Sequence, residues 1–182
     1  MSATPYLDRV RDIFVLGTQT GLRFSDIYRI KPHHVDGDVI TIKTFKSPTE
    51  VEIPIFPKTR VILEKYPNGL PHAISNQNFN EYVKEVGKRA GLTDYVIKTM
   101  THADGEHTFS RQKWELISSH TMRRSFCTNL YLAGYPVLGI CAISGHKTES
   151  EFIKYVKVSK KENAKRLIDF FKQKEQTKLM YG

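Results

Sequence analysis

The sequence predicts a mainly helical domain with a small antiparallel β-sheet, an α+β fold. Apolar residues recur at helical spacing through most of the chain. Strand-like alternation is confined to residues 39–55 and 93–114, and a glycine turn accompanies each stretch. A length of 182 residues, without an internal repeat or an interior linker, favours one domain.

Caps and turns delimit the predicted helices. Thr4 can cap the first helix, Gly21 can end it, and Pro32 stops the short helix that follows. In chain order, the predicted helices cover residues 5–20, 25–30, 58–66, 76–90, 121–133, 136–143 and 149–156, and a last helix begins at residue 159.

The last third of the chain carries further boundary signals. Gly145 is placed as a C-cap. Thr148 with Glu151, and Ser159 with Glu162, have the spacing of capping boxes, in which each residue's side chain bonds the other's backbone N–H.

The strands are predicted from period-two alternation and turn residues. Asp36-Gly37 is a hairpin signal before strands at 39–44 and 51–55, and Pro54 favours an edge position for the second strand. A second hairpin is predicted over residues 93–114, turning at Ala103-Asp104-Gly105.

Charge and composition favour an intracellular protein with a polyanionic partner. The formal charge is +9, and residues 156–182 hold eight Lys/Arg against three Asp/Glu, although a solvated basic tail is the plainer alternative. No apolar run is long enough for a membrane span, and no signal-peptide pattern opens the chain. Cys127 and Cys141 lie in apolar helical contexts, as expected of core residues in a reducing cytoplasm.

Two motifs could bind phosphate. His120 and Arg123 are three residues apart, so a helix presents both on one face, whereas Arg124 is turned away by about 100°. Arg23 stands at a helix entrance, where backbone N–H groups also attract an anion, and Asp26 could support either Arg23 or a neighbouring site histidine from behind. Each motif alone has a simpler explanation. The first could be a pair of surface or capping residues, and the second an intrahelical salt bridge.

Three further residues could take part in chemistry. His146 follows Gly145 between two helices, and Tyr155 lies nine residues later inside the predicted helix 149–156. Lys46 lies in the turn between the first two strands. Alone, each has an unremarkable explanation: a loop histidine, a packed aromatic ring and a solvated turn lysine.

Together and in this order, these residues resemble the tyrosine recombinase (phage integrase) family. The segments TGLRFSDI, SHTMRRSFCTNLYLAG and ISGHKTESEFIKYVK carry the likeness, which runs from about Leu7 to Lys157 and is closest in wording to integrases of bacterial conjugative transposons. The resemblance implies the catalytic-domain fold of that family. It also implies site-specific DNA recombination, the integration or excision of a mobile element, through a covalent 3′-phosphotyrosine intermediate.

The resemblance also implies a role for each residue. The site would consist of Tyr155 as the nucleophile, Arg23 and Arg123 as phosphate-binding arginines, Lys46 as the acid for the leaving 5′-hydroxyl, His120 as the first histidine and His146 at the histidine-or-tryptophan position. Of the two histidines we expect His120 to be the base, because the neighbouring Arg123 disfavours its protonated form, and His146 to contribute a further hydrogen bond.

Three positions leave questions open. Lys43 is the rival of Lys46, because a register slip would exchange them. Asp26 falls where relatives have a supporting acid that is commonly Glu. Ser144 occupies a position that is usually aliphatic, and its effect is expected on packing more than on chemistry.

No cofactor or metal is expected. Arginines are protonated at any physiological pH and can neutralise the charge that builds up on a phosphate. No acidic pair or His/Cys set has convincing ligand spacing, and His33 and His34 are adjacent rather than one helical turn apart.

The resemblance extends to domains and partners. Residues 1–182 are expected to form one catalytic domain, with a core over 1–157 and a basic amphipathic helix and tail over 158–182, and N-terminal core-binding and arm-binding domains are expected to be absent. Double-stranded DNA is the expected partner, with a homotetramer on DNA, a monomer for the isolated domain, and accessory DNA-bending proteins.

Alternatives remain at this stage. The chain could be a catalytically silent DNA-binding relative or a type IB topoisomerase-like strand transferase. The apolar stripe of the last helix could pack on its own domain or dock on a neighbouring subunit; it consists of Ala164, Leu167, Ile168 and Phe171.

Overall fold

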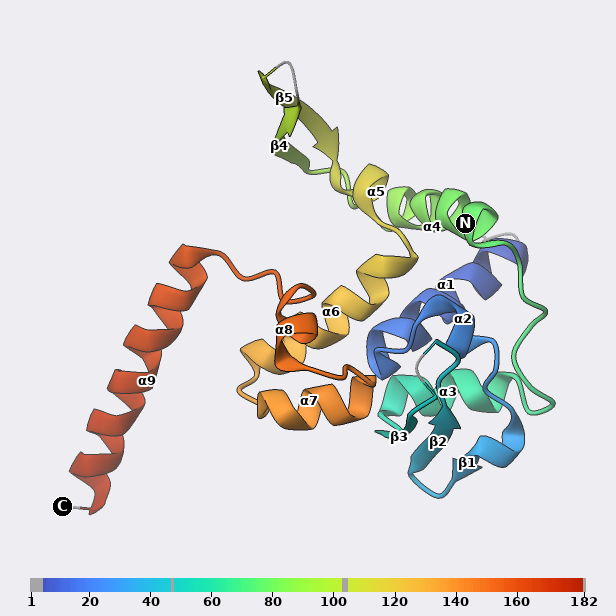
Figure 1. Ribbon diagram of the computed structural model, residues 1–182, viewed down its shortest axis with the longest axis horizontal. Coiled ribbons are helices and arrows are strands. Elements are labelled where there is room, and N and C mark those ends of the chain that lie inside the picture. The colour runs from blue at the N-terminus through green and yellow to red at the C-terminus, as the bar shows by residue number, and fades with distance from the viewer. Residues whose placement is uncertain (1–4, 47, 103–104, 182) are drawn as a thin grey trace.

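A computed structural model describes residues 5–46, 48–102 and 105–181. The chain forms a helical body from which a β-hairpin and a long C-terminal helix project (Figure 1). The helices are α1 (Pro5–Thr20), α2 (Phe24–Ile27), α3 (Pro57–Lys65), α4 (Asn76–Arg89), α5 (Lys113–Leu116), α6 (Ser119–Leu132), α7 (Val137–Ser144), α8 (Glu149–Ile153) and α9 (Lys160–Tyr181), with a 3₁₀ turn η1 (Pro32–His34). The strands are β1 (Val35–Asp36), β2 (Val39–Lys43), β3 (Glu50–Pro54), β4 (Tyr95–His102) and β5 (Gly105–Gln112).

The core forms around α1 and α6, which pack against each other. Helical spacing places Leu7, Val10 and Ile13 of α1 on one buried face. A Cβ on Gly17 would overlap the Met122 side chain, so this glycine allows α6 to approach α1 closely. Helices α3 and α4 pack against α1, and α7 packs against α6, so the α1–α6 pair lies at the centre of the helical body.

The first sheet is antiparallel, in the order β1-β2-β3. Ile40 and Ile53 are paired and fully buried, so alternation sends one face of the hairpin into the core. Pro54 pairs with Val39 on the edge strand, which confirms the prediction from its missing N–H. The turn between β2 and β3 carries Lys46 towards α2.

The second hairpin forms a sheet of its own. β4 and β5 pair from Tyr95 with Gln112 to His102 with Gly105 and project beyond α4 and α5 (Figure 1). The described residues thus form two separate small sheets rather than one. The predicted turn at Ala103 and Asp104 lies outside the described residues, and the short α5 was not predicted.

Helix α8 is shorter than the sequence predicts. Tyr155 lies in the turn after α8 rather than inside a helix, because its N–H donates to the Phe152 carbonyl at 2.8 Å and tightens the chain to a three-residue repeat. Thr148 caps α8 as predicted, but the Glu151 carboxylate accepts from Lys147 N–H instead of closing the box.

Helix α9 begins with the predicted capping box. Ser159 N–H donates to the Glu162 carboxylate at 2.7 Å, and Glu162 N–H donates to Ser159 Oγ at 3.1 Å. The helix then runs away from the body (Figure 1). Leu167 and Phe171 are 58% and 57% exposed. The apolar stripe of α9 therefore does not pack on its own domain in this structure.

A second, smaller core joins α6, α7 and α8. Cys127 and Cys141 are buried there as unpaired thiols beside Phe126 and Phe152, which confirms their assignment as core residues. Among the described helices, none is both long and apolar enough to cross a membrane.

Candidate active site

One cavity of about 300 Å³ collects side chains from five separate parts of the chain. The residues that line it are Arg23, Phe24, Ser25, Lys46, Asn76, Ser119, His120, Arg123 and Tyr155. Five of the six residues predicted to carry chemistry are thus brought together, although up to 132 residues of sequence separate them. The exception is His146.

Arg23 enters the cavity from the start of α2. It follows the turn at Gly21, and its extended backbone (φ −67°, ψ 150°) makes it the N-cap residue of that helix. Its Nη1 atom is buried and has no hydrogen-bond partner among the described residues. A buried guanidinium N–H that is left unpaired is costly, so this atom favours an anion in the cavity.

Arg123 approaches from α6 and is only 2% exposed. Its Nη1 donates to the carbonyls of Gly21 at 2.7 Å and Ser144 at 2.6 Å, and its Nη2 lies 2.9 Å from Nε2 of His146. Its Nε is buried without a partner among the described residues. Three protein groups thus bind the Arg123 guanidinium, and its Nε–H is the donor that has no partner among the described residues.

The two arginines reinforce each other's preference for an anion. Burial, and then the positive charge of Arg23, lowers the pKa of Arg123 from its ordinary value. No ion pair joins either arginine to a carboxylate within the described part of the chain. An oxyanion in this cavity would offset the repulsion between the two guanidinium groups and would accept hydrogen bonds from their unpaired nitrogens.

Tyr155 lies against the same guanidinium. The Arg123 guanidinium carbon lies 5.2 Å from the centre of the Tyr155 ring, within the range of a cation–π contact. Thr128 of α6 holds the tyrosine's segment, because its hydroxyl donates to the Tyr155 carbonyl at 3.4 Å and accepts from Lys157 N–H at 3.1 Å. The tyrosine and both arginines of this cavity come from one chain.

His120 and Lys46 also line the cavity. His120 is exposed in the first turn of α6, one turn before Arg123, as its spacing predicts. Lys46 reaches the cavity from the β2–β3 turn, whereas its rival Lys43 does not line it. Arg124, on the next face of α6, also lies outside the lining residues.

His146 stands behind Arg123 instead of lining the cavity. It is 8% exposed, and its ring lies 4.8 Å from the Tyr155 ring. Burial, followed by the charges of Arg123 and Arg23, lowers the pKa of His146 to about 3. The imidazole is therefore neutral at physiological pH.

Asp26 supports neither an arginine of the cavity nor a histidine, contrary to expectation. Its fully buried Oδ1 accepts from Phe45 N–H at 2.8 Å and from Arg29 Nη1 at 3.3 Å, and the same Arg29 atom donates to the Lys43 carbonyl at 2.9 Å. The acid thus fastens α2 to the turn that carries Lys46. An aspartate, shorter than the glutamate common in relatives, can make these bonds because the backbone of that turn lies next to α2.

The sequence did not single out four of the lining residues. Phe24 and Ser25 adjoin Arg23 in α2, while Asn76 and Ser119 begin α4 and α6. Only their adjacency to helix starts could have indicated them. Ser144 was expected to matter for packing, but its hydroxyl lies 2.7 Å from Nδ1 of His146, which corrects that expectation.

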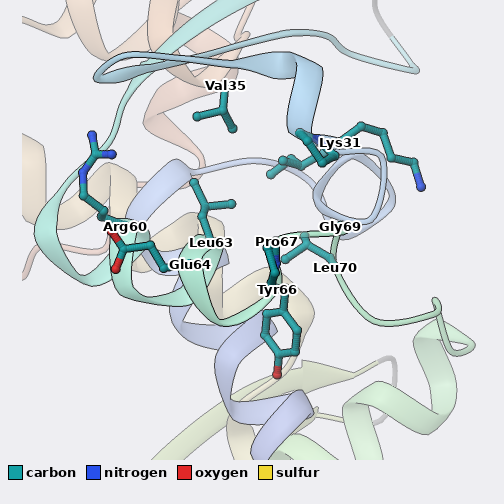
Figure 2. A pocket seen from close by; sticks show the side chains of 11 residues that line it. Lys31, Val35, Arg60, Leu63, Glu64, Tyr66, Pro67, Gly69 and Leu70 are labelled. Carbon is teal, nitrogen blue, oxygen red and sulfur yellow. The ribbon is translucent and has the colours of Figure 1, made fainter.

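A second cavity, of about 260 Å³, lies between η1 and α3 (Figure 2). Its walls are mainly apolar, and it contains none of the predicted site residues. Its arginine, Arg60, is already bonded to Asp38 and to the Gly37 carbonyl. The chemistry of this cavity therefore points to no particular ligand. Over the described residues, no group of three or more His, Cys, Asp or Glu side chains could hold a metal ion.

Comparison with solved structures shows which fold carries this cavity. The XerA recombinase matches with a TM-score of 0.65 and 13% identity over 93% of this chain and 65% of its own. A Tn1549 transposon integrase in complex with transposon right end DNA matches with a TM-score of 0.60 and 16% identity over 93% and 65%. The XerH site-specific recombinase in a post-cleavage complex matches with 0.63 and 14% over 92% and 47%.

The chain thus spans less than two thirds of the length of these structures. A search of curated proteins gives no match. The model of the phage integrase family matches residues 4–162, which include every residue of the cavity. The chain therefore belongs to the phage integrase family and has the catalytic-domain fold of the tyrosine recombinases.

Proposed function

We propose that this chain is a tyrosine-type site-specific DNA recombinase that cuts and rejoins strands through a covalent 3′-phosphotyrosine intermediate. The proposal rests on the convergence of Arg23, Arg123 and Tyr155 on one cavity, together with one buried nitrogen of each arginine that has no hydrogen-bond partner among the described residues. A phosphodiester is an anion whose oxygens can accept hydrogen bonds from both arginines. In this proposal two arginines bind its nonbridging oxygens, and Tyr155 lines the same cavity.

The proposed step balances without a cofactor. The Tyr155 oxygen attacks phosphorus, the bond from phosphorus to the 5′-oxygen breaks, and the 3′-phosphate stays joined to the tyrosine. The tyrosine proton passes to His120, and the leaving 5′-oxygen takes a proton from Lys46. Attack by another 5′-hydroxyl reverses the step, so the energy of the phosphodiester is conserved.

The arginines supply the charge that the step needs. Charge develops on the nonbridging oxygens in the five-coordinate transition state, and permanently protonated donors stabilise it from fixed positions. Removing one such donor commonly costs ~10²–10³ in rate. Because the tyrosine shares a cavity with its own chain's arginines, we propose that cleavage occurs in cis.

The similar structures support DNA as the substrate and a mobile element as the context. One is a transposon integrase bound to transposon end DNA, and another is a site-specific recombinase bound to its difH substrate after cleavage. We propose integration or excision of such an element as the biological reaction, in the cytoplasm of a bacterium. We also propose that residues 1–157 form the catalytic core and residues 158–182 an accessory helix and tail.

The test is a nicked suicide duplex that carries the element's own ends, incubated with the protein in EDTA. A covalent protein–DNA adduct is expected, and it should retain a label on the 5′ end of the cut strand, because that fragment carries the 3′-phosphate. Tyr155→Phe should abolish the adduct. Tyr135→Phe is the matched control, since Tyr135 is exposed and does not line the cavity.

An undiminished adduct in Tyr155→Phe would refute the assignment of the nucleophile. Relaxation of supercoiled DNA without site preference would instead favour a topoisomerase-like reaction, and DNA binding without any adduct a silent relative.

We further propose that α9 joins subunits of a tetramer on DNA, while the chain alone is a monomer. Leu167, Ile168 and Phe171 are more than half exposed on a helix that leaves the body, and Arg166 fixes only its start by donating to the Tyr131 carbonyl at 2.8 Å. Truncation after Ser159 should leave cleavage intact and abolish synapsis. Normal synapsis of the truncated protein would count against the role of α9.

A further inference from the structure

The hydroxyl of Ser144 contacts both a backbone carbonyl and the imidazole of His146. Ser144 Oγ lies 2.5 Å from the Ile140 carbonyl and 2.7 Å from Nδ1 of His146. A hydroxyl has one proton, and a carbonyl can only accept, so the Ser144 proton points to Ile140. Ser144 must then accept from His146, which places the imidazole proton on Nδ1.

The other side of the ring requires the same tautomer. Nε2 of His146 lies 2.9 Å from Nη2 of Arg123, and a guanidinium nitrogen can only donate. Nε2 must therefore offer its lone pair. The low pKa of His146 agrees with this, because a doubly protonated ring would turn an N–H towards the arginine.

The hydrogen bonds thus run in one direction through buried groups. Arg123 donates to His146, His146 donates to Ser144, and Ser144 donates to the Ile140 carbonyl. All three side chains are less than 10% exposed. Two carbonyls, of Gly21 and Ser144, bind Nη1 of Arg123, and His146 adds a contact to Nη2, so the imidazole supplies the third bond that orients the planar guanidinium.

We infer that Ser144 is a positioning residue of the site: its hydroxyl fixes the Nδ1–H tautomer of His146, and that tautomer holds Arg123 in the orientation that lines the cavity. The effect on catalysis rests on the proposed function, whereas the tautomer is a property of the folded chain alone.

The first measurement is the tautomer itself. In protein with ¹⁵N-labelled histidine, a long-range proton–nitrogen correlation spectrum at pH 7 distinguishes protonated from unprotonated ring nitrogens, and His146→Gln identifies the signals. A protonated Nδ1 and an unprotonated Nε2 are expected. A protonated Nε2 in the unsubstituted protein would overturn the inference, whatever the protein's activity.

The second measurement compares Ser144→Ala with Ser144→Thr. The alanine variant removes the acceptor of Nδ1–H, so the Nδ1–H signature should be lost or mixed with the other tautomer. The rate of adduct formation on saturating DNA should fall about ten- to a hundred-fold, as is typical when a supporting group behind a site is removed, while DNA affinity stays unchanged. Ser144→Thr, which keeps a hydroxyl, should restore both readouts.

Ser150→Ala, at an exposed position of α8, is the matched control and should change neither readout. Full cleavage activity or an unchanged tautomer in a folded Ser144→Ala variant would overturn the inference. If the unsubstituted protein shows the expected tautomer but forms no adduct, the proposed function fails and the tautomer assignment stands.

Discussion

The carbonyl of Gly21 accepts a hydrogen bond of 2.7 Å from Nη1 of Arg123, across 102 residues of sequence. This bond joins the turn that precedes Arg23 to the helix that carries Arg123. The backbone position of this glycine therefore helps to set the spacing of the two arginines that line the cavity. That glycine is constrained twice, since its φ is +66° and a Cβ would overlap the ring of Phe126.

Gly21→Ala should consequently destabilise the protein by about 1–3 kcal/mol more than the backbone effect alone, because the added carbon overpacks the core. Gly37→Ala is the matched control: its φ is also positive, at +54°, but nothing lies within 4 Å of its Cβ position. Urea unfolding measures both variants. An equal loss of unfolding free energy in the two variants would show that the Phe126 ring moves aside without destabilising the core. Adduct formation should also fall in Gly21→Ala only.

Lys46 and Lys43 provide a test of the leaving-group acid. If Lys46 donates the proton, Lys46→Ala should slow cleavage of ordinary DNA by ~10² or more. DNA with sulfur in place of the scissile 5′-oxygen should be cleaved by this variant at nearly the unsubstituted rate, because a thiolate leaves without a proton. Single-turnover rates on both substrates give the comparison.

Lys43→Ala serves as the matched control, since Lys43 is exposed at the end of β2 and does not line the cavity. It should leave both rates unchanged. A Lys46→Ala defect of equal size on the two substrates would mean that this lysine binds DNA rather than donating the proton.

Local chemistry determined what could be predicted from the sequence. The box of Ser159 with Glu162 and the C-cap at Gly145 both formed as expected, because each needs only its near neighbours in the chain. The candidate site was predicted as a set of residues by resemblance, and the structure brings five of the six together in one cavity.

The partners of those residues were not predictable, because tertiary packing supplies them. Asp26 bonds to Phe45, nineteen residues away, and no spacing rule indicates this. His146 is buried against the rings of Phe152 and Tyr155 and beside Arg123, and the role of Ser144 follows only from that burial. The end of α8 before Tyr155 likewise depends on where Phe152 is buried and on the hydroxyl of Thr128.

Thr128 should control how firmly the tyrosine is held. Its hydroxyl contacts both the Tyr155 carbonyl and Lys157 N–H, so Thr128→Val keeps the shape but removes both bonds. We expect a loss of about 1 kcal/mol of stability and a slower adduct-forming step. Amide exchange at Lys157 should accelerate. Thr108→Val, on the projecting hairpin, is the control, and unchanged exchange at Lys157 in Thr128→Val would contradict this role.

The neutral state of His146 should make stability depend on pH. Because burial and the neighbouring arginines lower its pKa from 6.5 to about 3, the unfolded chain takes up a proton below pH 6.5 that the folded chain refuses. The stability associated with the neutral ring is therefore complete above pH 6.5 and is lost as the pH falls towards 3. The slope approaches about 1.4 kcal/mol per pH unit in that window.

Urea unfolding at pH 7.5 and pH 5 measures this slope, with an expected contribution from His146 of about 2 kcal/mol. His146→Gln can still accept from Arg123 but does not titrate, so its stability should fall less between the two pH values. His72→Gln, at an exposed position, should keep the slope of the unsubstituted protein. The same slope in His146→Gln as in the unsubstituted protein would show that the buried imidazole is protonated as readily as in the unfolded chain, and the directed hydrogen bonds from Arg123 to Ser144 would then be untenable.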